Sequence, residues 1–364
     1  MATIQRPEAI LRTSQVITNI DAMATKAKRA GVALRPHFKT HQSIPIGRWF
    51  RDAGVTGITV STPEMAAYFA DDGWEDITIA FPFYPNQIQQ INHLAEKISL
   101  RLFINSPDQI TYLEKNLDYP VAVYIEADAG YGRSGVSVHH QTEVIDAIVQ
   151  AATACEKVHL HGFYFHDGDT YRTGSAEKII AVAERNYNAA GELKRTYPDL
   201  SICLGDTPSC SVMDSFPHVD EISPGNFVFF DLTQVVTGSC AIEEVALFIE
   251  APVAQIQPDK DRAILHCGAV HCSKDLITIP GGHTVYGVPV WFDEHQKPHL
   301  VWESYLSSLS QEHGVLEHLS AAQKAITDRN TIMICPAHSC LTANLFKEYR
   351  DDQSGQPISK RILS

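Results

Sequence analysis

The feature that most constrains the fold is an alternation of short β-branched runs with segments of helical periodicity, from residue 12 to about residue 230. This alternation is typical of βα units that build a parallel sheet. Eight strands with intervening helices are the number needed for a (β/α)8 TIM barrel, although a doubly wound sheet could use the same elements in another order. The predicted strands are Val32–Phe38, Gly57–Val60, Ile77–Ala80, Leu100–Ile104, Val121–Glu126, His159–Phe165, Ser201–Gly205 and Glu221–Ser223. The predicted helices include 14–30, 63–72, 86–97, 138–154 and 175–196.

The pattern changes after about residue 235, where apolar runs are separated by Gly, Pro, Asp and His. Such a pattern is typical of a β-rich domain. Only one helix is predicted there, at Leu319–Ile326, and the polar tail from Glu348 to Ser364 is expected to lie on the surface. The predicted strands of this part are Val245–Phe248, Ala263–Leu265, Thr284–Trp291 and Ile332–Cys335.

The charge balance limits the classes of partner. The chain has 29 Lys and Arg against 43 Asp and Glu, a formal net charge of −14, and no basic cluster. Nucleic acids and anionic membranes bind to a basic face, so we expect neither as a partner. The apolar stretch Val235–Ala254 contains glutamates and is not expected to span a membrane. The N-terminus lacks a secretory pattern and the eight cysteines are scattered, which together predict a reduced, cytoplasmic protein.

The first predicted strand ends in a row of basic residues. In an extended strand, Arg35, His37, Lys39 and His41 would share one face. Barrel interiors are normally apolar, so such a row is expected to border a site. Neighbouring cations lower the pKa of a lysine and free its amine to form a Schiff base with a carbonyl. The alternative is a solvated loop after the strand.

Polar and Gly-rich segments follow several other predicted strands. The carboxyl ends of barrel strands are where active sites are built, and the loops after the seventh and eighth strands commonly hold a phosphate. A single glycine in such a loop is more often a turn residue, so it is their joint placement that indicates a site. The segments are 61–62, 105–106, 128–135, 166–171, 205–209 and 224–227.

Three cysteine–histidine groupings occur in the C-terminal part. His338 and Cys340 are two residues apart, a spacing at which both side chains can reach one soft divalent ion, with zinc as the first expectation. Two ligands are too few for a closed structural site, so the interpretation is an open metal site; the alternative is a buried cysteine beside a surface histidine. The pairs His266-Cys267 and His271-Cys272 are interpreted as strand or turn residues.

The order of several short motifs resembles one known family. The segment RPHFKTH at 35–41 resembles the cofactor-lysine motif of the D-serine dehydratase and D-threonine aldolase family, the fold-type III pyridoxal 5'-phosphate (PLP) enzymes related to alanine racemase. Each motif is weak alone, but their order is specific and spans nearly the whole chain. The others are DxGxxRxG at 128–135, GFYFH at 162–166, TPS at 207–209, PGNF at 224–227, SKD at 273–275, EHG at 312–314 and PAHSC at 336–340.

The resemblance implies a role for each matching position. Lys39 would bind PLP as a Schiff base, Arg133 would lie near the phenolic oxygen of the cofactor, and His166 would lie beside the pyridine ring. The remaining implied positions are the phosphate-binding residues Thr207, Gly225 and Asn226 and the metal ligands His338 and Cys340.

The resemblance also implies the architecture. The family has a (β/α)8 barrel of the alanine racemase type followed by a β-rich domain, and it forms homodimers. We therefore expect residues 11–235 to form the PLP-binding barrel, and residues 1–10 and 236–364 to form a β-rich domain that carries the metal site.

The chain departs from the family pattern in three places. His266-Cys267-Gly268 replaces an Asp-x-Gly segment. The H-x-G-x-x-Y run at 166–171 contains an extra acidic pair, Asp167 and Asp169, which we expect to alter the charge preference for the substrate. The C-terminal catalytic tyrosine of alanine racemase has no counterpart that we can place, which argues against racemisation.

The function implied by the resemblance is a PLP- and divalent-metal-dependent lyase for a D-β-hydroxy-α-amino acid. Dehydration would give a keto acid and ammonia, whereas aldol cleavage would give glycine and an aldehyde. Cys340 favours zinc and the D-serine dehydratase type, since an acidic residue there would suit the manganese of aldolases. The alternatives are the D-threonine aldolase type, then an amino-acid racemase, then a non-catalytic PLP carrier, although such carriers end after the barrel.

Overall fold

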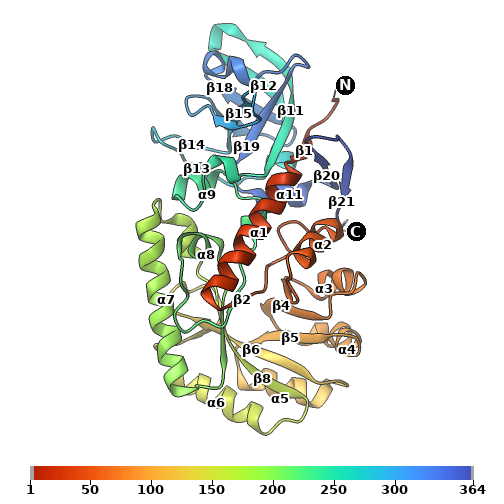
Figure 1. Cartoon of the computed structure of the whole chain (residues 1–364), viewed down its shortest axis with the longest axis vertical. Helices are drawn as coiled ribbons and strands as arrows, with labels where there is room; N and C mark the ends of the chain where they lie inside the picture. Colours follow the sequence, from red (N-terminus) through yellow and green to blue (C-terminus); the bar gives the residue numbers. More distant parts are fainter. Residues whose placement is uncertain (1–3, 362–364) are drawn as a thin grey trace. The chain divides into compact units, whose positions relative to one another are not determined.

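The computed structural model describes residues 4–361 and divides into two compact units (Figure 1). Residues from Asp21 to Gly225 form one unit, called here the barrel unit. Of the described residues, 4–20 and 226–361 form the other, called here the β-rich unit. The long helix α1 (Thr13–Ala30) begins in the β-rich unit and ends in the barrel unit.

The barrel unit is built on a parallel sheet whose strand order is β2-β10-β9-β8-β6-β5-β4-β3, with the short β7 (Val136–Ser137) beside β6. A bridge between His37 and Thr59 joins the chain after β2 to β3, so the two ends of this order meet and the sheet closes. The closure confirms the barrel and excludes the doubly wound alternative. The strands are β2 (Ala33–Leu34), β3 (Ile58–Val60), β4 (Asp76–Pro82), β5 (Ser99–Ile104), β6 (Val121–Asp128), β8 (Val158–Phe165), β9 (Ser201–Leu204) and β10 (Glu221–Ile222), at the predicted places.

Helices surround the strands of the barrel unit (Figure 1). Several begin at a Ser or Thr whose side chain accepts a backbone N–H, followed by proline in the first turn, as at Ser43, Thr62 and Ser106. The structure adds α2, α5 and α8 to the helices predicted from the sequence. The helices are α2 (Ile44–Asp52), α3 (Pro63–Ala70), α4 (Ile88–Ala95), α5 (Pro107–Asn116), α6 (Thr142–Thr153), α7 (Ala176–Thr196) and α8 (Thr207–Val212), with 3-10 turns at Pro85–Gln87 and Gly168–Arg172.

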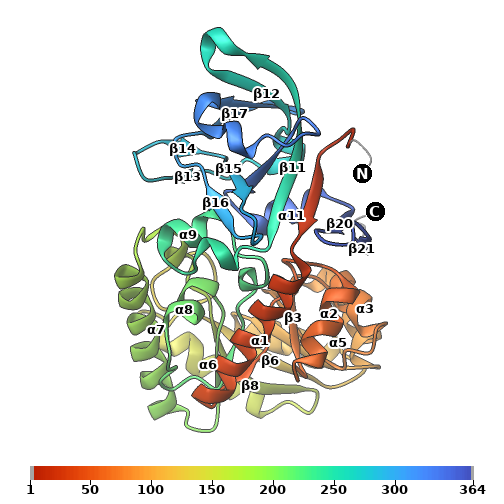
Figure 2. The same ribbon diagram turned by 45° about the horizontal axis from the view of Figure 1, so that its top comes forward.

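The β-rich unit is organised around the long strand β11 (Leu247–Gln257) (Figure 2). β11 pairs antiparallel with β1 (Glu8–Leu11) and β19 (Thr331–Pro336), and after an irregularity between Val253 and Gln255 it pairs with β12 (Arg262–His266). β12 continues through β18 (His313–Glu317) to β17 (Tyr305–Leu309). The other strands are β13 (Ile277–Thr278), β14 (Thr284–Val285), β15 (Gly287–Phe292), β16 (Pro298–Leu300), β20 (Glu348–Asp351) and β21 (Pro357–Ser359).

Two expectations for the C-terminal part are wrong. The predicted helix at Leu319–Ile326 is a 3-10 segment, whereas the α-helices are short ones that the sequence reading missed. The tail is not only a surface segment, because β20 pairs with β1 and Tyr349 is fully buried. This pairing joins residues more than 300 positions apart in the chain, so no local sequence pattern predicts it. The missed helices are α9 (Leu232–Thr237), α10 (Ala269–Cys272) and α11 (Ser339–Leu345). Between residues 4 and 361, no helix combines the length and the apolar character that crossing a membrane requires.

Candidate active site

The segment after β2 does not continue as an extended strand. Residues 38–41 form a turn, called here the lysine turn. It is closed by the hydrogen bond from Gln42 N to Phe38 O at 3.0 Å. Lys39 is exposed at this turn, and its backbone N–H donates to His37 Nδ1 at 3.3 Å. His41 is buried against Phe38, with ring centroids 4.4 Å apart. The prediction that four basic residues share one face is therefore wrong, because the turn rotates His41 into the apolar core.

Arg35 is also not part of a site. It is buried, and it pairs with Asp76 on β4 at 2.6 Å and with Glu221 on β10 at 3.1 Å. Burial alone would lower the pKa of Arg35, but these carboxylates outweigh it and the pKa is raised. Arg101 reaches the same two carboxylates at 3.1 and 3.0 Å. The buried charges are thus paired and link strands of the barrel.

Four of the basic side chains from the motifs do lie close together in the barrel unit. Burial, followed by the charges of Lys39 and Arg133, holds the pKa of His37 well below its usual value. Burial and the same two cations lower the pKa of His166 to about 3. The imidazoles of His37 and His166 are therefore neutral at physiological pH. They lie near the exposed amine of Lys39 and the guanidinium of Arg133. A neutral imidazole beside an accessible lysine suits an uncharged aromatic ring and a carbonyl, which PLP offers.

His166 is held in one orientation at the end of β8. Its Nδ1 lies in hydrogen-bond contact with the carbonyl oxygen of Gly205, which follows β9, so Nδ1 carries the proton. The ring of Tyr131 lies across it, with centroids 6.0 Å apart at 76°. The guanidinium carbon of Arg133 lies over the Tyr131 ring, 5.7 Å from its centroid. The loops after β6 and β8 thus present Arg133 and His166 near Lys39.

The loops after β9 and β10 meet at Thr207 and Gly225. The N–H of Gly225 donates to Thr207 Oγ1 at 3.2 Å, and the N–H of Thr207 donates to Tyr171 Oη at 3.2 Å. A Cβ on Gly225 would lie 2.9 Å from the carbonyl oxygen of His37, so only glycine fits this approach to the lysine turn. The structure therefore brings two of the predicted phosphate-binding residues together beside the turn that carries Lys39. Thr207, Gly225 and Tyr171 are called here the cradle. Only the H-x-G-x-x-Y spacing indicated Tyr171 in the sequence.

Asp206 stabilises the start of α8, the helix that begins at Thr207 of the cradle. It is the N-cap of α8, where its side chain accepts from Ser209 N at 2.7 Å and from Thr170 Oγ1 at 3.1 Å. Burial raises the pKa of Asp206 to about 7, against the effect of these hydrogen bonds. The sequence reading did not single out this residue, although an aspartate before Thr-Pro-Ser is a recognisable N-cap.

The acidic pair that follows His166 is held by one arginine. Asp167 is 2% exposed and forms an ion pair with Arg185 of α7, and Asp169 lies 3.5 Å from the same guanidinium. Asn186 adds a hydrogen bond to Asp167 at 3.3 Å. Arg185 therefore neutralises part of the charge of this pair, and the expectation that the pair alters the charge preference for the substrate stays a prediction.

The second cluster lies in the β-rich unit and centres on Asp231. This fully buried residue is the N-cap of α9, and its Oδ2 lies 3.1 Å from His338 Nδ1 and 2.9 Å from the N–H of Ser339. Asn226 donates to Asp231 at 2.7 Å and reaches Cys340 Sγ at 3.4 Å. The structure thus brings His338 and Cys340 together, and it adds Asp231, which the sequence reading missed.

Asp231 and His338 stabilise each other's charge in this cluster. Burial opposes the charge on Asp231, yet the hydrogen bond and charge of His338, with Ser339 N–H and Asn226, hold the pKa of Asp231 below its usual value. Burial also opposes the charge on His338, but Cys340 and Asp231 raise the pKa of His338 well above its usual value. A metal would replace the proton on Nε2 of His338 while Asp231 stays on Nδ1, which is the usual outer-shell arrangement of a ligating histidine. Imidazole, thiol and an orienting carboxylate therefore fit a soft divalent ion.

The side-chain amide of Asn226, a predicted phosphate-binding residue, makes hydrogen bonds within the cluster around Asp231. Its amide contacts Asp231, Ser339 and Cys340. Any phosphate contact made by Asn226 would therefore come from its backbone N–H.

Comparisons with known proteins agree with this geometry. The family described as "Alanine racemase, N-terminal domain" matches residues 11–233, and "Putative serine dehydratase domain" matches residues 246–350. The chain is 31% identical to D-threo-3-hydroxyaspartate dehydratase of Delftia sp. (strain HT23), over 96% of this chain and 94% of that protein. It is 26% identical to D-serine dehydratase of Dictyostelium discoideum (95% and 93% covered), and 24% identical to D-threonine aldolase of Arthrobacter sp (95% and 88% covered).

Solved structures show the same relationship. A cysteine-to-alanine mutant of D-threo-3-hydroxyaspartate dehydratase, solved in the metal-free form, superposes with a TM-score of 0.86 at 29% identity, covering 99% of this chain and 98% of that one. The chain belongs to the D-serine dehydratase and D-threonine aldolase family, the fold-type III PLP enzymes related to alanine racemase.

Proposed function

We propose that this enzyme dehydrates a D-β-hydroxy-α-amino acid of the D-serine type to a keto acid and ammonia, with PLP on Lys39 and a zinc ion on His338 and Cys340. The broader assignment is a PLP-dependent lyase that acts on D-β-hydroxy-α-amino acids, because the family and its relatives are lyases of this class. The dehydratase reaction and the zinc ion are more specific proposals, and they are based on His338 and Cys340.

The residues of the barrel unit fit PLP. Lys39 is exposed and is proposed to supply the amine that attaches the cofactor, and Arg133, whose charge acts on His37 beside this turn, is proposed to hold its phenolic oxygen. Thr207 and Gly225, with the backbone of Asn226, are proposed to hold the phosphate. Bound PLP acts as an electron sink for the bond that breaks at Cα.

The protein groups around the cofactor have defined tasks. The amine of Lys39 takes the proton from Cα of the bound amino acid, since it is the accessible base of the site. Neutral His166, fixed by the carbonyl of Gly205, is proposed to lie beside the pyridine ring without adding charge. The glycine at position 225 keeps the cradle close to the lysine turn.

The residues of the β-rich unit fit a divalent metal. Asp231 fixes the tautomer of His338 so that Nε2 can ligate, and Asn226 holds the Cys340 sulfur at 3.4 Å. A thiolate and an imidazole favour zinc over manganese. Bound zinc with an open position supplies a Lewis acid for a hydroxyl group.

The observation that carries the dehydratase proposal is the His338–Cys340 pair oriented by a buried carboxylate. D-threonine aldolase-type cleavage is the second candidate, because the Arthrobacter aldolase is similar over 95% of this chain. The second unit with its metal cluster disfavours the non-catalytic carrier, and the lack of an assignable catalytic tyrosine disfavours the racemase.

Product analysis tests the proposal. The purified, PLP-loaded enzyme is incubated with D-serine, D-threonine and D-threo-3-hydroxyaspartate, with and without a chelator. We expect chelator-sensitive keto acid and ammonia in equal amounts. Glycine with an aldehyde would assign the aldolase reaction instead, and neither product pair from any of these substrates would refute the lyase.

Two variants separate the cofactor from the metal. Cys340→Ala is expected to lose chelator-sensitive turnover and to keep the visible absorption of bound PLP. Ser339→Ala, a neighbour on the same turn, is the matched control and should keep both. A Cys340→Ala enzyme with full turnover that is still lost on chelation would contradict the role of Cys340.

The remaining assignments are also proposals. We propose a reduced, cytoplasmic homodimer; none of the eight cysteines, all of which lie within residues 4–361, forms a disulfide, which suits a reducing compartment. We propose residues 11–235 as the PLP-binding domain and residues 1–10 with 236–364 as the metal-carrying domain. Of these, residues 1–3 and 362–364 lie outside the part that the structure describes.

A further inference from the structure

Three side chains with metal-ligating groups gather in the β-rich unit, separate from the cluster around Asp231. They are His266 at the end of β12, His271 in α10 and Glu312 in the turn between β17 and β18. One ligand atom from each lies within 4.8 Å of the other two. His266 Nε2 is 3.4 Å and His271 Nε2 is 3.8 Å from the same Glu312 oxygen, and the two imidazole rings are 5.2 Å apart at 88°.

The backbone holds these three residues in place. β12 pairs with β18 so that His266 lies opposite His313, the residue after Glu312. The N–H of Ala269 donates to Ser310 O at 2.8 Å, which ties the start of α10 to the turn that carries Glu312. A Cβ on Gly268 would lie 2.1 Å from the carbonyl oxygen of Gln311, so only glycine permits this approach. The cluster is therefore built by strand pairing and by one obligatory glycine.

The contacts within the cluster leave room for a metal. The Nδ1 atom of His271 is buried and finds no hydrogen-bond partner among residues 4–361. The contacts of 3.4 and 3.8 Å to Glu312 are longer than good hydrogen bonds. A divalent ion about 2.1 Å from each ligand would draw the three atoms to roughly 3.4 Å apart, a contraction that the exposed Glu312 side chain can make.

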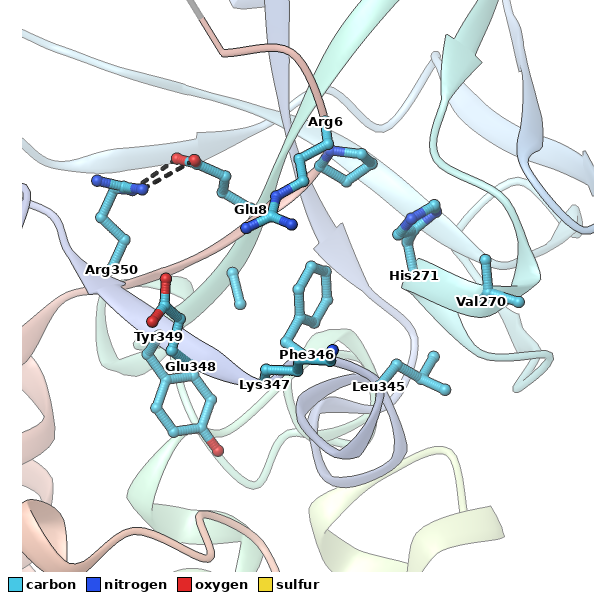
Figure 3. Close-up of a pocket in the computed structure, with 12 residues that line it drawn as sticks. Arg6, Glu8, Val270, His271, Leu345, Phe346, Lys347, Glu348, Tyr349 and Arg350 are labelled. Atoms are coloured by element: carbon cyan, nitrogen blue, oxygen red, sulfur yellow. Dashed lines mark hydrogen bonds and ion pairs between the residues drawn. The ribbon is translucent and has the colours of Figure 1, made fainter. Parts of the chain in front are cut away.

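His271 also lines a pocket of about 310 Å³ (Figure 3). Its ring lies on the same wall as Val270, and Arg6, Leu345 and Phe346 line other parts of the pocket. The ring is thus shared by the cluster and the pocket. A metal held by only three protein ligands needs water or a small ligand in the fourth position, and the pocket has room for either.

We propose that His266, His271 and Glu312 form a second divalent-metal site with an open coordination position beside this pocket. Two imidazoles and a carboxylate are a ligand set for zinc or cobalt rather than for calcium or magnesium, which take oxygen ligands. The site shares no residue with His338 and Cys340, so it does not depend on the proposed dehydratase function.

Cobalt distinguishes the two sites, because a thiolate ligand produces a near-ultraviolet charge-transfer band that a His–His–Glu site lacks. The PLP-loaded, full-length protein is stripped with a chelator, dialysed and titrated with Co²⁺ alone, and bound cobalt is counted by elemental analysis. We expect two Co²⁺ per wild-type chain. Cys340→Ser should bind one without the thiolate band, whereas His271→Gln should bind one with the band unchanged.

Matched variants make the result specific. Glu312→Gln should weaken the second site at least tenfold, and the neighbouring exposed His313→Gln should bind two Co²⁺ as the wild type does. Circular dichroism establishes that each variant is folded, and Glu312 lies in an exposed turn where the substitution leaves the core intact. A single Co²⁺ per wild-type chain that carries the thiolate band, or a His271→Gln protein that binds as much Co²⁺ as the wild type, would overturn the proposal.

Discussion

Replacement of Asp231 by asparagine separates the shape of this buried residue from its charge. Oδ1 of Asp231 accepts the N–H of Gln234 at 3.0 Å and caps α9, which asparagine can also do. Oδ2 faces only donors, namely His338 Nδ1, the Asn226 amide and the N–H and hydroxyl of Ser339. The amide nitrogen of asparagine in that place would face these donors with a donor of its own.

The size of the effect follows from which donors can adapt. The Asn226 amide and the Ser339 hydroxyl can rotate, whereas the Ser339 N–H and the His338 ring cannot turn away. Two lost hydrogen bonds to a charged group, at about 1.5–3 kcal/mol each, predict a loss of about 3–6 kcal/mol in the free energy of unfolding. Loss of the partner on Nδ1 also predicts a roughly 10–100-fold weaker metal at His338 and Cys340.

Two measurements test this prediction. Urea unfolding gives the stability, and competition with a chromophoric chelator gives the affinity of the cobalt that carries the thiolate band. Ser339→Ala is the control, because it removes one hydroxyl from Asp231 at a cost of about 1 kcal/mol and keeps the carboxylate. A folded Asp231→Asn protein whose cobalt affinity at this site equals the wild type would refute the orienting role of Asp231.

Three further outcomes are expected. Lys39→Ala should lose the visible absorption of bound PLP and at least about 10³-fold in turnover, measured by absorbance and keto-acid formation; a persistent band would contradict the assignment of the cofactor lysine. Gly225→Ala should weaken PLP binding in fluorescence titrations, because its methyl group would lie 2.9 Å from the His37 oxygen, and unchanged binding would show that the cradle is not used. Asp206, whose pKa is raised to about 7, keeps its proton in the folded state while the unfolded chain loses it near pH 4, so its contribution to stability falls between pH 4 and pH 7 by up to about 4 kcal/mol. Thermal melts of Asp206→Asn should therefore show less loss than the wild type over this interval, and parallel curves would contradict the raised pKa.

The order of the elements was readable along the chain because parallel barrel strands and their helices are local patterns. β6 and β8 lie within one or two residues of their predicted limits, since β-branched runs bounded by turn residues suffice to indicate a buried strand. The site motifs were also readable, because the loops after barrel strands occur at regular intervals. The helices α9 and α11 were missed, since six or seven residues are too few to show a helical period.

Contacts between residues far apart in the chain determine the features that the sequence did not predict. Asp231 is more than 100 positions from His338, and nothing in its local sequence shows that its carboxylate orients that imidazole. The partner of Arg35 was equally hidden, because a strand pattern cannot tell an arginine in a site from one paired with Asp76 and Glu221.

The order of residues along the chain thus determined the barrel and the thiol–imidazole pair, because these depend on spacings of a few residues, whereas the turn at Lys39 became apparent only in the structure. Only the folded structure showed which charges neutralise one another and which histidines are neutral. Those properties depend on burial and on distances between groups that are far apart in the chain, as with His266, His271 and Glu312.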